Sequence, residues 1–384
     1  MHGTIESGFR VELRRLDELA AFASELRDLT ARAIAPNAFY EPSFMAASAP
    51  VFGRDVMAGL VWRRSMPKQL TGFFPVAIER RRYGLKMPML IGWTHPYGPL
   101  GTPLIDRDAG DAAVAAWLDH IAADPALPKL MLMPYLPTEG DVAHAFDAAL
   151  AHRDGRSEHF ALHRRALLAP TGDRADYLDH TMPHKKRKEL RRQRRRLSDA
   201  GTLTSSATSD PAELTAALID FLSLEAAGWK GRAGTAAKGN DAVRCFVVEA
   251  VSALAAEGKA SVARLALDGR AIAAIVTLRS GDAAWCWKIA YDESYSRASP
   301  GVQLLLDVTQ DMLDDPTIVR ADSCATPDHP MIDHIWRERL VLADWLVSVG
   351  PCSATAFAGV RALESARRAA IDAARSIRNR LKRK

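Results

Sequence analysis

Residues 260–324 constrain the fold of this chain most strongly, because their periodicity places three short strands, a helix and a fourth strand in close succession. The first two strands meet at the Asp-Gly-Arg turn 268–270. The third strand, 283–290, leads through a loop into a helix at 302–313, and a strand follows at 318–323. This succession predicts a sheet covered by helices, in which ligands usually bind beyond the carboxyl ends of the strands.

The loop after the third strand ends in Ser299, Pro300 and Gly301 and opens directly into the helix. Serine is a favoured helix cap, and proline suits the first turn of a helix. The N–H groups of Gly301, Val302 and Gln303 then have no partner inside the helix, so they can point at a phosphate group. The sequence therefore predicts an anion-binding site at the end of a strand.

The chain has 384 residues, which favours about two domains. Its hydrophobic content of 48% is ordinary for a soluble globular protein. No apolar run reaches the roughly 18 residues that a membrane span needs. Residues 1–10 lack the charged-then-apolar pattern of a signal peptide, so we expect a cytoplasmic protein. The cysteines have no framework spacing and are expected to be reduced thiols; they are Cys245, Cys286, Cys324 and Cys352.

Positive charge is concentrated in two segments. Residues 185–196 hold nine Lys and Arg against Glu189, and residues 361–384 hold nine against Glu364 and Asp372. Because the formal net charge of the whole chain is only +5, the remainder is acidic. The high isoelectric point alone therefore does not indicate a nucleic-acid-binding protein.

The chain reads as two halves with the same order of elements, although the halves share little sequence. We expect a degenerate N-terminal domain at 1–172 and a basic helical linker at 173–201. The second domain is expected at 202–352, and a basic amphipathic helix at 353–384.

The second half has the order strand, two helices, three antiparallel strands, helix, strand, helix and strand pair, which is the order of the GNAT acyltransferase fold. Three local segments agree: the basic helix that ends at Gly201, the segment 224–231 and the loop 295–301. In these features the chain resembles the acetyltransferase domain of bacterial proteins associated with cellulose and exopolysaccharide synthesis. The layout is similar to that of the Fem peptidyl aminoacyltransferases, which carry two GNAT-like halves. The resemblance covers 175–350 and is weak over 1–170.

The resemblance implies an α/β (α+β) fold with tandem GNAT-like domains, each a mixed, mostly antiparallel twisted sheet flanked by helices. It also implies acyl transfer from acetyl-CoA or another acyl-CoA, without a metal, to an amine or hydroxyl. The acceptor would be a small molecule or a glycan or peptide precursor of the envelope. The implied contacts with the donor are Arg297, Ser299, Gly301, Val302 and Gln303.

One departure from the family pattern concerns the diphosphate loop, which usually reads Arg/Gln-x-x-Gly-x-Gly/Ala. Arg297 is kept, but Pro300 stands at the first glycine and Val302 at the last position. Because proline has no N–H, the loop loses one donor for a diphosphate. This loss points either to weaker binding of acetyl-CoA or to a different acyl donor.

Acyl transfer needs a base, donors for the tetrahedral oxyanion and an acid for the leaving group. Glu225, near the end of a helix that should face the sheet, is the candidate base, directly or through a water molecule. The alternative is an ordinary glutamate on a helix surface. Tyr291, Tyr295 and Ser296 are candidates for protonating the leaving thiolate, and the sequence does not choose among them.

Two aromatic features flank these residues. Trp229 and Lys230 lie in a loop bounded by glycines, which could close on a substrate or could be a solvated loop with one anchoring indole. The side chains of Trp285, Trp287 and Tyr291 are expected on one face of a strand, where they could line an acyl or sugar groove. Such a stripe more often belongs to the core.

Lys288 is expected on the opposite face of that strand, where it could contact a phosphate or form a surface ion pair.

The segment 322–334 follows the next strand and should face the same crevice. In the substrate-site interpretation, Asp322 orients an amine or hydroxyl and His329 assists. A metal site would use Asp, Cys and His, but His329 and His334 miss the i, i+4 spacing of a helical pair. A hydrolase triad of Ser323, His329 and Asp333 lacks a nucleophile elbow. The remaining interpretation is a set of caps and turns.

Three functions remain open at this stage: an acyl-CoA-dependent acyltransferase, a Fem-like transferase that uses aminoacyl-tRNA, and an inactive scaffold that binds a polymer. Residues 185–196 would bind tRNA in the second case, and otherwise an anionic glycan, lipid headgroups or the acidic part of this chain. No other nucleic acid is expected as a partner.

Residues 361–384 could bind an anionic membrane surface, which would place the protein at the inner membrane, or could pack on their own domain or on a second protomer.

Overall fold

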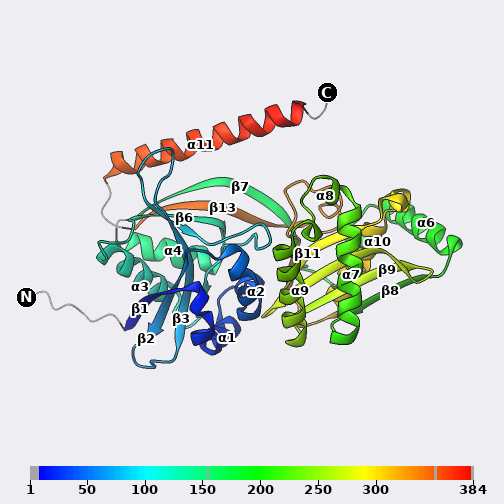
Figure 1. Cartoon of the computed structure of the whole chain (residues 1–384), viewed down its shortest axis with the longest axis horizontal. Helices are drawn as coiled ribbons and strands as arrows, with labels where there is room; N and C mark the ends of the chain where they lie inside the picture. Colours follow the sequence, from blue (N-terminus) through cyan, green and yellow to red (C-terminus); the bar gives the residue numbers. More distant parts are fainter. Residues whose placement is uncertain (1–7, 154, 350–352, 382–384) are drawn as a thin grey trace, which may run out of the picture. The chain divides into compact units, whose positions relative to one another are not determined.

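The computed structural model describes residues 8–153, 155–349 and 353–381 (Figure 1). Two units emerge from the contacts within the chain. The first comprises Met1–Ala35, Asp55–His163 and Val341–Lys384, and the second comprises Pro36–Arg54 and Arg164–Leu340. Both units are discontinuous in sequence, unlike the predicted domain ranges. The basic segment that was expected as a linker belongs to the second unit, and the final helix belongs to the first.

The first unit contains a mixed sheet. Its strands are β1 (Phe9–Arg15), β2 (Val56–Arg63), β3 (Leu70–Glu79), β4 (Met89–Gly92) and β6 (Leu130–Pro137), adjacent in this order. The pairs from β1 to β4 are antiparallel, whereas β4 and β6 are parallel. The short β5 (Leu104–Ile105) pairs with β3, and β13 (Glu338–Ser348) pairs antiparallel with β6.

The second unit repeats this pattern. Its strands are β8 (Leu203–Thr208), β9 (Ala260–Leu267), β10 (Arg270–Ser280), β11 (Ala283–Tyr291) and β12 (Arg320–Asp322). The pairs from β8 to β11 are antiparallel, and β11 and β12 are parallel. The end of β7 (Arg156–Leu168) pairs antiparallel with β12. The predicted repeat of element order is therefore confirmed, and each unit takes one sheet strand from the other half of the sequence.

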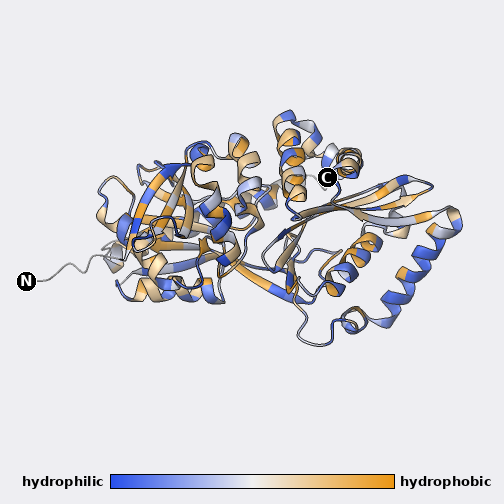
Figure 2. Ribbon diagram, turned by 90° about the horizontal axis from the view of Figure 1, so that it is seen from below, coloured by the Kyte–Doolittle hydropathy of each residue, from blue (hydrophilic) through white to orange (hydrophobic). Residues whose placement is uncertain are grey.

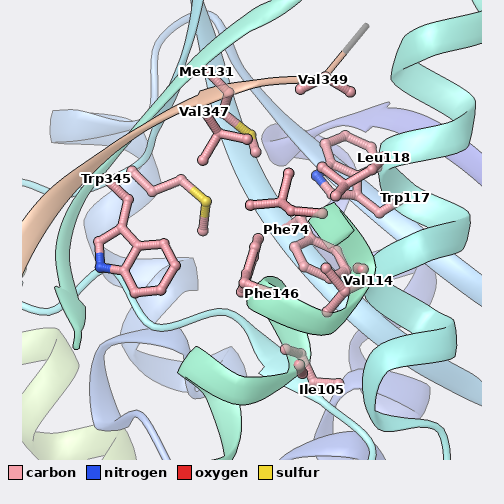
Figure 3. Packing of buried hydrophobic residues seen from close by; sticks show 14 of the residues in the cluster. Phe74, Ile105, Val114, Trp117, Leu118, Met131, Phe146, Trp345, Val347 and Val349 are labelled. Atoms are coloured by element: carbon pink, nitrogen blue, oxygen red, sulfur yellow. The ribbon is translucent and has the colours of Figure 1, made fainter. Parts of the chain in front are cut away.

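Helices cover the sheet of the first unit. They are η1 (Leu16–Phe22), α1 (Ala23–Arg32), α3 (Gly110–Ala123) and α4 (Asp141–Ala151). Figure 3 shows the core of this unit, where the rings of Phe74 and Trp117 stack at 5.4 Å and Phe146 packs edge-on against Phe74 at 6.4 Å. Burial of such large aromatic side chains is the main source of stability for this unit.

The helices and turns of the second unit are η2 (Ala38–Tyr40), α2 (Pro42–Phe52), α5 (Tyr177–Thr181), α6 (His184–Ala200), α7 (Pro211–Ala227), α8 (Trp229–Arg232), η3 (Ala237–Gly239), α9 (Asp241–Ala256), η4 (Glu293–Ala298) and α10 (Pro300–Asp314). The apolar face of α10 packs on the sheet, and α6 joins the same cluster through Leu190 and Leu197. These two leucines are the apolar stripe of the basic segment, whose other side chains make α6 strongly hydrophilic (Figure 2). The apolar contact between this strongly charged helix and the rest of the unit is thus narrow.

Two local predictions toward the end of the chain are wrong. The short helix expected after the strand at 318–323, over residues 328–336, is replaced by turns: Asp328 has φ of 56°, and Pro330 disfavours a helical backbone at His329. The expected strand pair at 340–349 is the single strand β13.

Beyond its pairing with β4, strand β6 of the first unit is contacted by the loop that contains Gly101. The Gly101 N–H donates a hydrogen bond to the Tyr135 carbonyl at 3.2 Å. A Cβ atom at Gly101 would lie only 2.0 Å from the Pro134 carbonyl oxygen, so the loop lies directly on β6.

The first half of α11 (Ala354–Leu381) packs on its own unit, one of the alternatives left open for this segment. Phe357 and Val360 join an apolar cluster, and the Glu364 carboxylate, fully buried, accepts hydrogen bonds from Arg82 and Tyr83. None of the helices in the described part of the chain has the length and apolar character of a membrane span. Cys245, Cys286 and Cys324 are free thiols, and Cys352 lies outside the described residues.

Candidate active site

The two parallel strands of the second unit separate partway along their length. Their pairing runs from Ala283 to Trp285 on β11 and ends at Asp322 on β12, whereas β11 continues to Tyr291. Two residues after β12 ends, Cys324 adopts a left-handed conformation, with φ of 52°. Beyond Trp285, residues 286–291 of β11 are not paired with β12; this stretch, called the gap below, lies at the strand end where the sequence predicted a ligand.

The amino terminus of α10 offers fewer donors than predicted. The helix begins at Pro300, and the N–H groups of Val302 and Gln303 already donate to the Ser299 carbonyl at 2.9 and 3.0 Å. Gln303 is the fourth residue of the helix, so its N–H makes the first regular helical bond. The predicted phosphate contacts of these two amides are therefore wrong, and the predicted side-chain cap from Ser299 is absent in the structure. The third predicted amide, that of Gly301, belongs to a buried residue.

Gly301 and Arg297, two of the predicted contacts with the donor, differ in their exposure. A Cβ atom at Gly301 would lie 3.1 Å from the Tyr291 ring and 3.3 Å from the Met331 methyl, so only glycine fits without displacement. Arg297 is exposed at the end of η4. Gln303 is buried, and its side-chain amide donates to the Leu190 carbonyl at 2.9 Å, which ties α10 to α6.

Glu225 lies in the last turn of α7, where only 4% of its surface is exposed. Its carboxylate accepts a hydrogen bond from Lys230 Nζ at 2.9 Å and another from the Ala237 N–H at 2.9 Å. Lys230 also donates to the Ile289 carbonyl at 3.4 Å. The predicted base is thus ion-paired, and it anchors the loop that carries Lys230 to the edge of β11.

A β-bulge changes which side chains share a face of β11. Val276 pairs with Lys288 and Thr277 pairs with Cys286, so Trp287 is the extra residue. Trp287 is 4% exposed and packs edge-on against Phe44 and Phe246, at centroid distances of 5.6 and 6.1 Å. Its predicted place in a substrate groove is therefore wrong.

The same bulge places Lys288 on the side of the strand that Trp287 occupies, which corrects the predicted alternation. Its Nζ lies 5.9 Å from the Trp287 ring centroid. Burial, together with the nearby charge of Lys230, lowers the pKa of Lys288 to about 8. Tyr291 instead faces Gly301 at the start of α10.

Asp322 and His329, the other two predicted catalytic residues in this region, are each already engaged in hydrogen bonds. The Asp322 carboxylate forms a buried ion pair with Arg165 and accepts a hydrogen bond from the Cys324 N–H at 2.9 Å. His329 Nδ1 accepts a hydrogen bond from the Met331 N–H at 3.3 Å, and burial lowers the pKa of His329. In this arrangement Asp322 stabilises the end of β12.

The gap has little character of a metal or thiol-nucleophile site. Within the described residues, no three His, Cys, Asp or Glu side chains are grouped so that they could hold a metal ion. Burial raises the pKa of Cys286 to about 12 and raises that of Cys324 as well, so both thiols are protonated at neutral pH.

Sequence reasoning missed several charged residues of this region. Arg165 lies 157 residues from Asp322 and carries no local signal. Glu293 follows the strand end directly, and its carboxylate accepts the Trp229 N–H at 2.7 Å and pairs with Arg232 at 2.7 Å. Trp229 itself is 57% exposed. The loop after α7 is therefore held by two carboxylates, Glu225 and Glu293.

Comparison with known families identifies this part of the chain. Residues 184–323 match the family profile described as an acetyltransferase (GNAT) domain. This segment is a GNAT domain. Its match supports transferase activity in general, and the GNAT domain contains the β11–β12 gap, α10 and the Glu225 loop.

Several solved structures share the fold of the GNAT domain and the unit before it. FemX aligns with a TM-score of 0.56 and 9% identity, covering 85% of this chain and 95% of that one. A conserved protein of unknown function from Bacteroides thetaiotaomicron aligns with a TM-score of 0.54 and 11% identity, covering 88% and 99%. The C-terminal domain of a proposed lysylphosphatidylglycerol synthetase from Agrobacterium fabrum gives 0.54 and 14%, covering 90% and 96%. At these identities the likeness concerns the fold, which is the predicted Fem-like layout of tandem GNAT-like units. A search of curated proteins found no match.

Proposed function

We propose that this protein is an acyltransferase that moves an acyl group from an acyl-CoA to an amine or hydroxyl acceptor, such as an envelope or polysaccharide precursor. The observation that carries the proposal is the gap in the GNAT domain, where pairing ends at Trp285 and Asp322 while β11 continues. A strand edge without its neighbour offers N–H and C=O groups to an extended ligand. The pantetheine arm of CoA is such a ligand, because it is extended and contains two amides.

The residues around the gap fit such a donor in part. In this proposal the N–H of the buried Gly301 and the side chain of the exposed Arg297 would contact the diphosphate that follows the pantetheine arm. Lys230 and Lys288 would stabilise the tetrahedral oxyanion. The lowered pKa of Lys288, about 8, leaves part of its population neutral near pH 7.5, so it can accept a proton from the acceptor. The Tyr291 phenol, beside Gly301, would return a proton to the leaving thiolate.

Calorimetric titration of the pure protein with acetyl-CoA and with longer acyl-CoAs tests the donor. We expect binding of at least one CoA ester and slow release of free thiol, which a thiol reagent detects. Absence of binding for every CoA ester would refute the assignment of the donor. Release of thiol would exclude a catalytically inactive scaffold.

A second candidate donor is aminoacyl-tRNA, and α6 favours it. Three of its nine cations are ion-paired in the structure: Arg187 with Asp179, Arg192 with Glu189 and Arg194 with Asp307. The other six are exposed and have no ion pair among the described residues; they are Lys185, Lys186, Lys188, Arg191, Arg195 and Arg196. These six cations suit a larger polyanion better than one diphosphate. The amides of Val302 and Gln303, which already donate to the Ser299 carbonyl, agree with this.

Salt dependence of tRNA binding separates the two donors. We expect that binding through α6 would weaken steeply as salt rises and would be lost when Lys188, Arg191 and Arg195 become Gln. Arg194 is kept, because it holds α6 to Asp307. Binding that is absent, or that does not change with salt, would leave acyl-CoA as the donor.

The basic end of α11 is our proposed contact with an anionic membrane surface. The helix is docked as far as Arg368, which pairs with Asp344 at 2.9 Å, whereas Ile377 is 60% exposed. A chain that ends at Arg368 keeps the docked part and removes most of the charge. Flotation with anionic vesicles should be lost in this shorter chain, and equal flotation of both chains would contradict the proposal.

A further inference from the structure

Glu293 joins two segments of the GNAT domain that lie far apart in the sequence. It is the first residue of η4, the short helix that leads into α10, and its side chain contacts the loop after α7. One carboxylate oxygen accepts the Trp229 N–H at 2.7 Å, and the other pairs with the Arg232 guanidinium at 2.7 Å. A Cβ atom at Gly228 would lie 3.4 Å from the same carboxylate. Glu293 therefore holds the start of this loop at two points.

The other end of η4 reaches the place proposed for the donor. Arg297 lies in the last turn of η4, and Ser299 alone separates η4 from the start of α10 at Pro300. A 3-10 helix has three residues per turn, so side chains four positions apart point in different directions. Glu293 can thus hold the loop after α7 while the exposed Arg297 contacts a ligand.

Glu293 also borders the space beside the candidate base. A pocket of about 20 Å³ is lined by Glu293 together with Glu225, Trp229 and Lys230. Glu225 and Lys230 form the ion pair at 2.9 Å described above. Lys230 lies between Trp229 and Arg232 in the single turn of α8, so the two contacts of Glu293 also fix the backbone that carries Lys230.

These two contacts are short compared with the direct contact between the loop and β11. That contact, from Lys230 Nζ to the Ile289 carbonyl, measures 3.4 Å. The bonds from Arg232 and from the Trp229 N–H hold the pKa of Glu293 below its ordinary value of 4.5, so the carboxylate is ionised at neutral pH. Hydrogen bonds to an ionised group are stronger than those between neutral groups. Glu293 is therefore the stronger of these links between the loop and the end of β11.

We propose that Glu293 is a positioning residue that couples occupancy of the donor site to the order of the loop that carries Lys230. A donor that binds at Arg297 and the start of α10 restrains η4, and η4 restrains Trp229 through Glu293. Lys230 is then held beside Glu225 when the donor is present. The role of the donor rests on the proposed acyl-CoA activity. Because such coupling is reciprocal, an ordered loop also favours binding of the donor.

The link itself is tested without a donor, by hydrogen exchange of the full chain followed by mass spectrometry. Glu293→Ala removes both contacts, and we expect exchange to become about tenfold faster across 228–235 and across 293–299 together. Arg270→Gln is the matched control, because it removes the exposed ion pair with Asp292 at 3.0 Å and leaves both contacts of Glu293 in place. Faster exchange in one segment alone, or the same change in the control, would overturn the link.

Acetyl-CoA and a longer acyl-CoA then test the coupling. In the wild-type protein we expect the ester to slow exchange about tenfold across both 293–299 and 228–235. In Glu293→Ala the slowing should remain across 293–299 and be lost across 228–235. Slowing of 293–299 alone in the wild-type protein, or slowing of 228–235 that persists in the variant, would overturn the coupling. If no CoA ester changes exchange in the wild-type protein, the proposed donor is wrong, and the comparison without a donor still decides whether Glu293 links the two segments.

Discussion

Lys230 Nζ lies 2.9 Å from Glu225 Oε1, and this ion pair joins the end of α7 to the loop that follows it. The Glu225 carboxylate also accepts a hydrogen bond from the Ala237 N–H, so one buried side chain contacts the loop after α7 at both Lys230 and Ala237. The residue that the sequence indicated as a base is thus first of all the anchor of the segment that covers the reacting end of β11.

Replacing Glu225 with Gln should loosen this loop. We expect faster amide hydrogen exchange across 228–240 and a loss of stability of about 1–3 kcal/mol, because the partly buried Lys230 loses its counter-ion. Hydrogen exchange by mass spectrometry and urea unfolding measure the two effects. Glu213→Gln, an exposed position on the same helix, is the control and should change neither. An unchanged exchange rate in the loop would show that Glu225 does not anchor it.

Gly301→Ala should impair binding of the donor. The new methyl group would lie 3.1 Å from the Tyr291 ring and beside the amide proposed to contact a diphosphate, so we expect affinity for an acyl-CoA to fall at least tenfold. Titration calorimetry measures the change. Gly239→Ala is the control, because a Cβ atom there meets nothing within 4 Å. Equal affinity in both variants would place the diphosphate elsewhere.

Trp287 and Trp229 should contribute very differently to the stability of the protein. Trp287→Ala removes a buried ring that packs on Phe44 and Phe246, so the free energy of unfolding should fall by about 3–5 kcal/mol. Trp229→Ala, at a position that is 57% exposed, should change it by less than about 0.5 kcal/mol. Chemical unfolding of both variants measures this difference, and similar losses would mean that Trp287 does not belong to the core.

Lys288 should make the stability of the second unit depend on alkaline pH. Its folded pKa of about 8 lies below the ordinary value of 10.5, so between these values the unfolded chain binds more protons than the folded one. Stability relative to Lys288→Met should therefore rise from about pH 8 to pH 10, by roughly 2–3 kcal/mol in total. Thermal unfolding of both proteins across this range measures the effect. Parallel pH profiles would contradict the lowered pKa.

Glu364 should make the first unit sensitive to acid. Arg82 and Tyr83 bond to its carboxylate, and these bonds hold the pKa of Glu364 below its ordinary value of 4.5 despite burial. The stabilisation is present above that value and is lost as the pH falls through the folded pKa. Glu364→Gln should cost about 3 kcal/mol at pH 7 and less at low pH, measured by urea unfolding. Asp372→Asn, on the same helix but exposed, should leave stability nearly unchanged.

Much of the fold followed from local patterns. Alternation along 260–290 and the Asp268-Gly269 turn predicted β9, β10 and β11 within one residue of their observed bounds, because hairpins depend on neighbouring residues. The start of α10 was placed two residues late. Because of this error the Gln303 amide was expected to be free. In the structure it donates the first regular hydrogen bond of the helix, to the Ser299 carbonyl.

The candidate site depended more on residues far apart. The Asp322 pair with Arg165 and the Glu364 pair with Arg82 join positions more than 150 residues apart, and no periodicity along the chain reveals them. The bulge at Trp287 likewise arises from the pairing of β10 with β11, and it reversed the predicted side of Lys288.

The amino-acid sequence alone determined the order of the elements, the repeat of the two halves and the position of the loop before α10, because these follow from short-range periodicity and turn chemistry. Tertiary structure decided which amides, carboxylates and lysines remain available for chemistry. A polar group that packing leaves without water must find a partner, and that partner can come from any part of the chain.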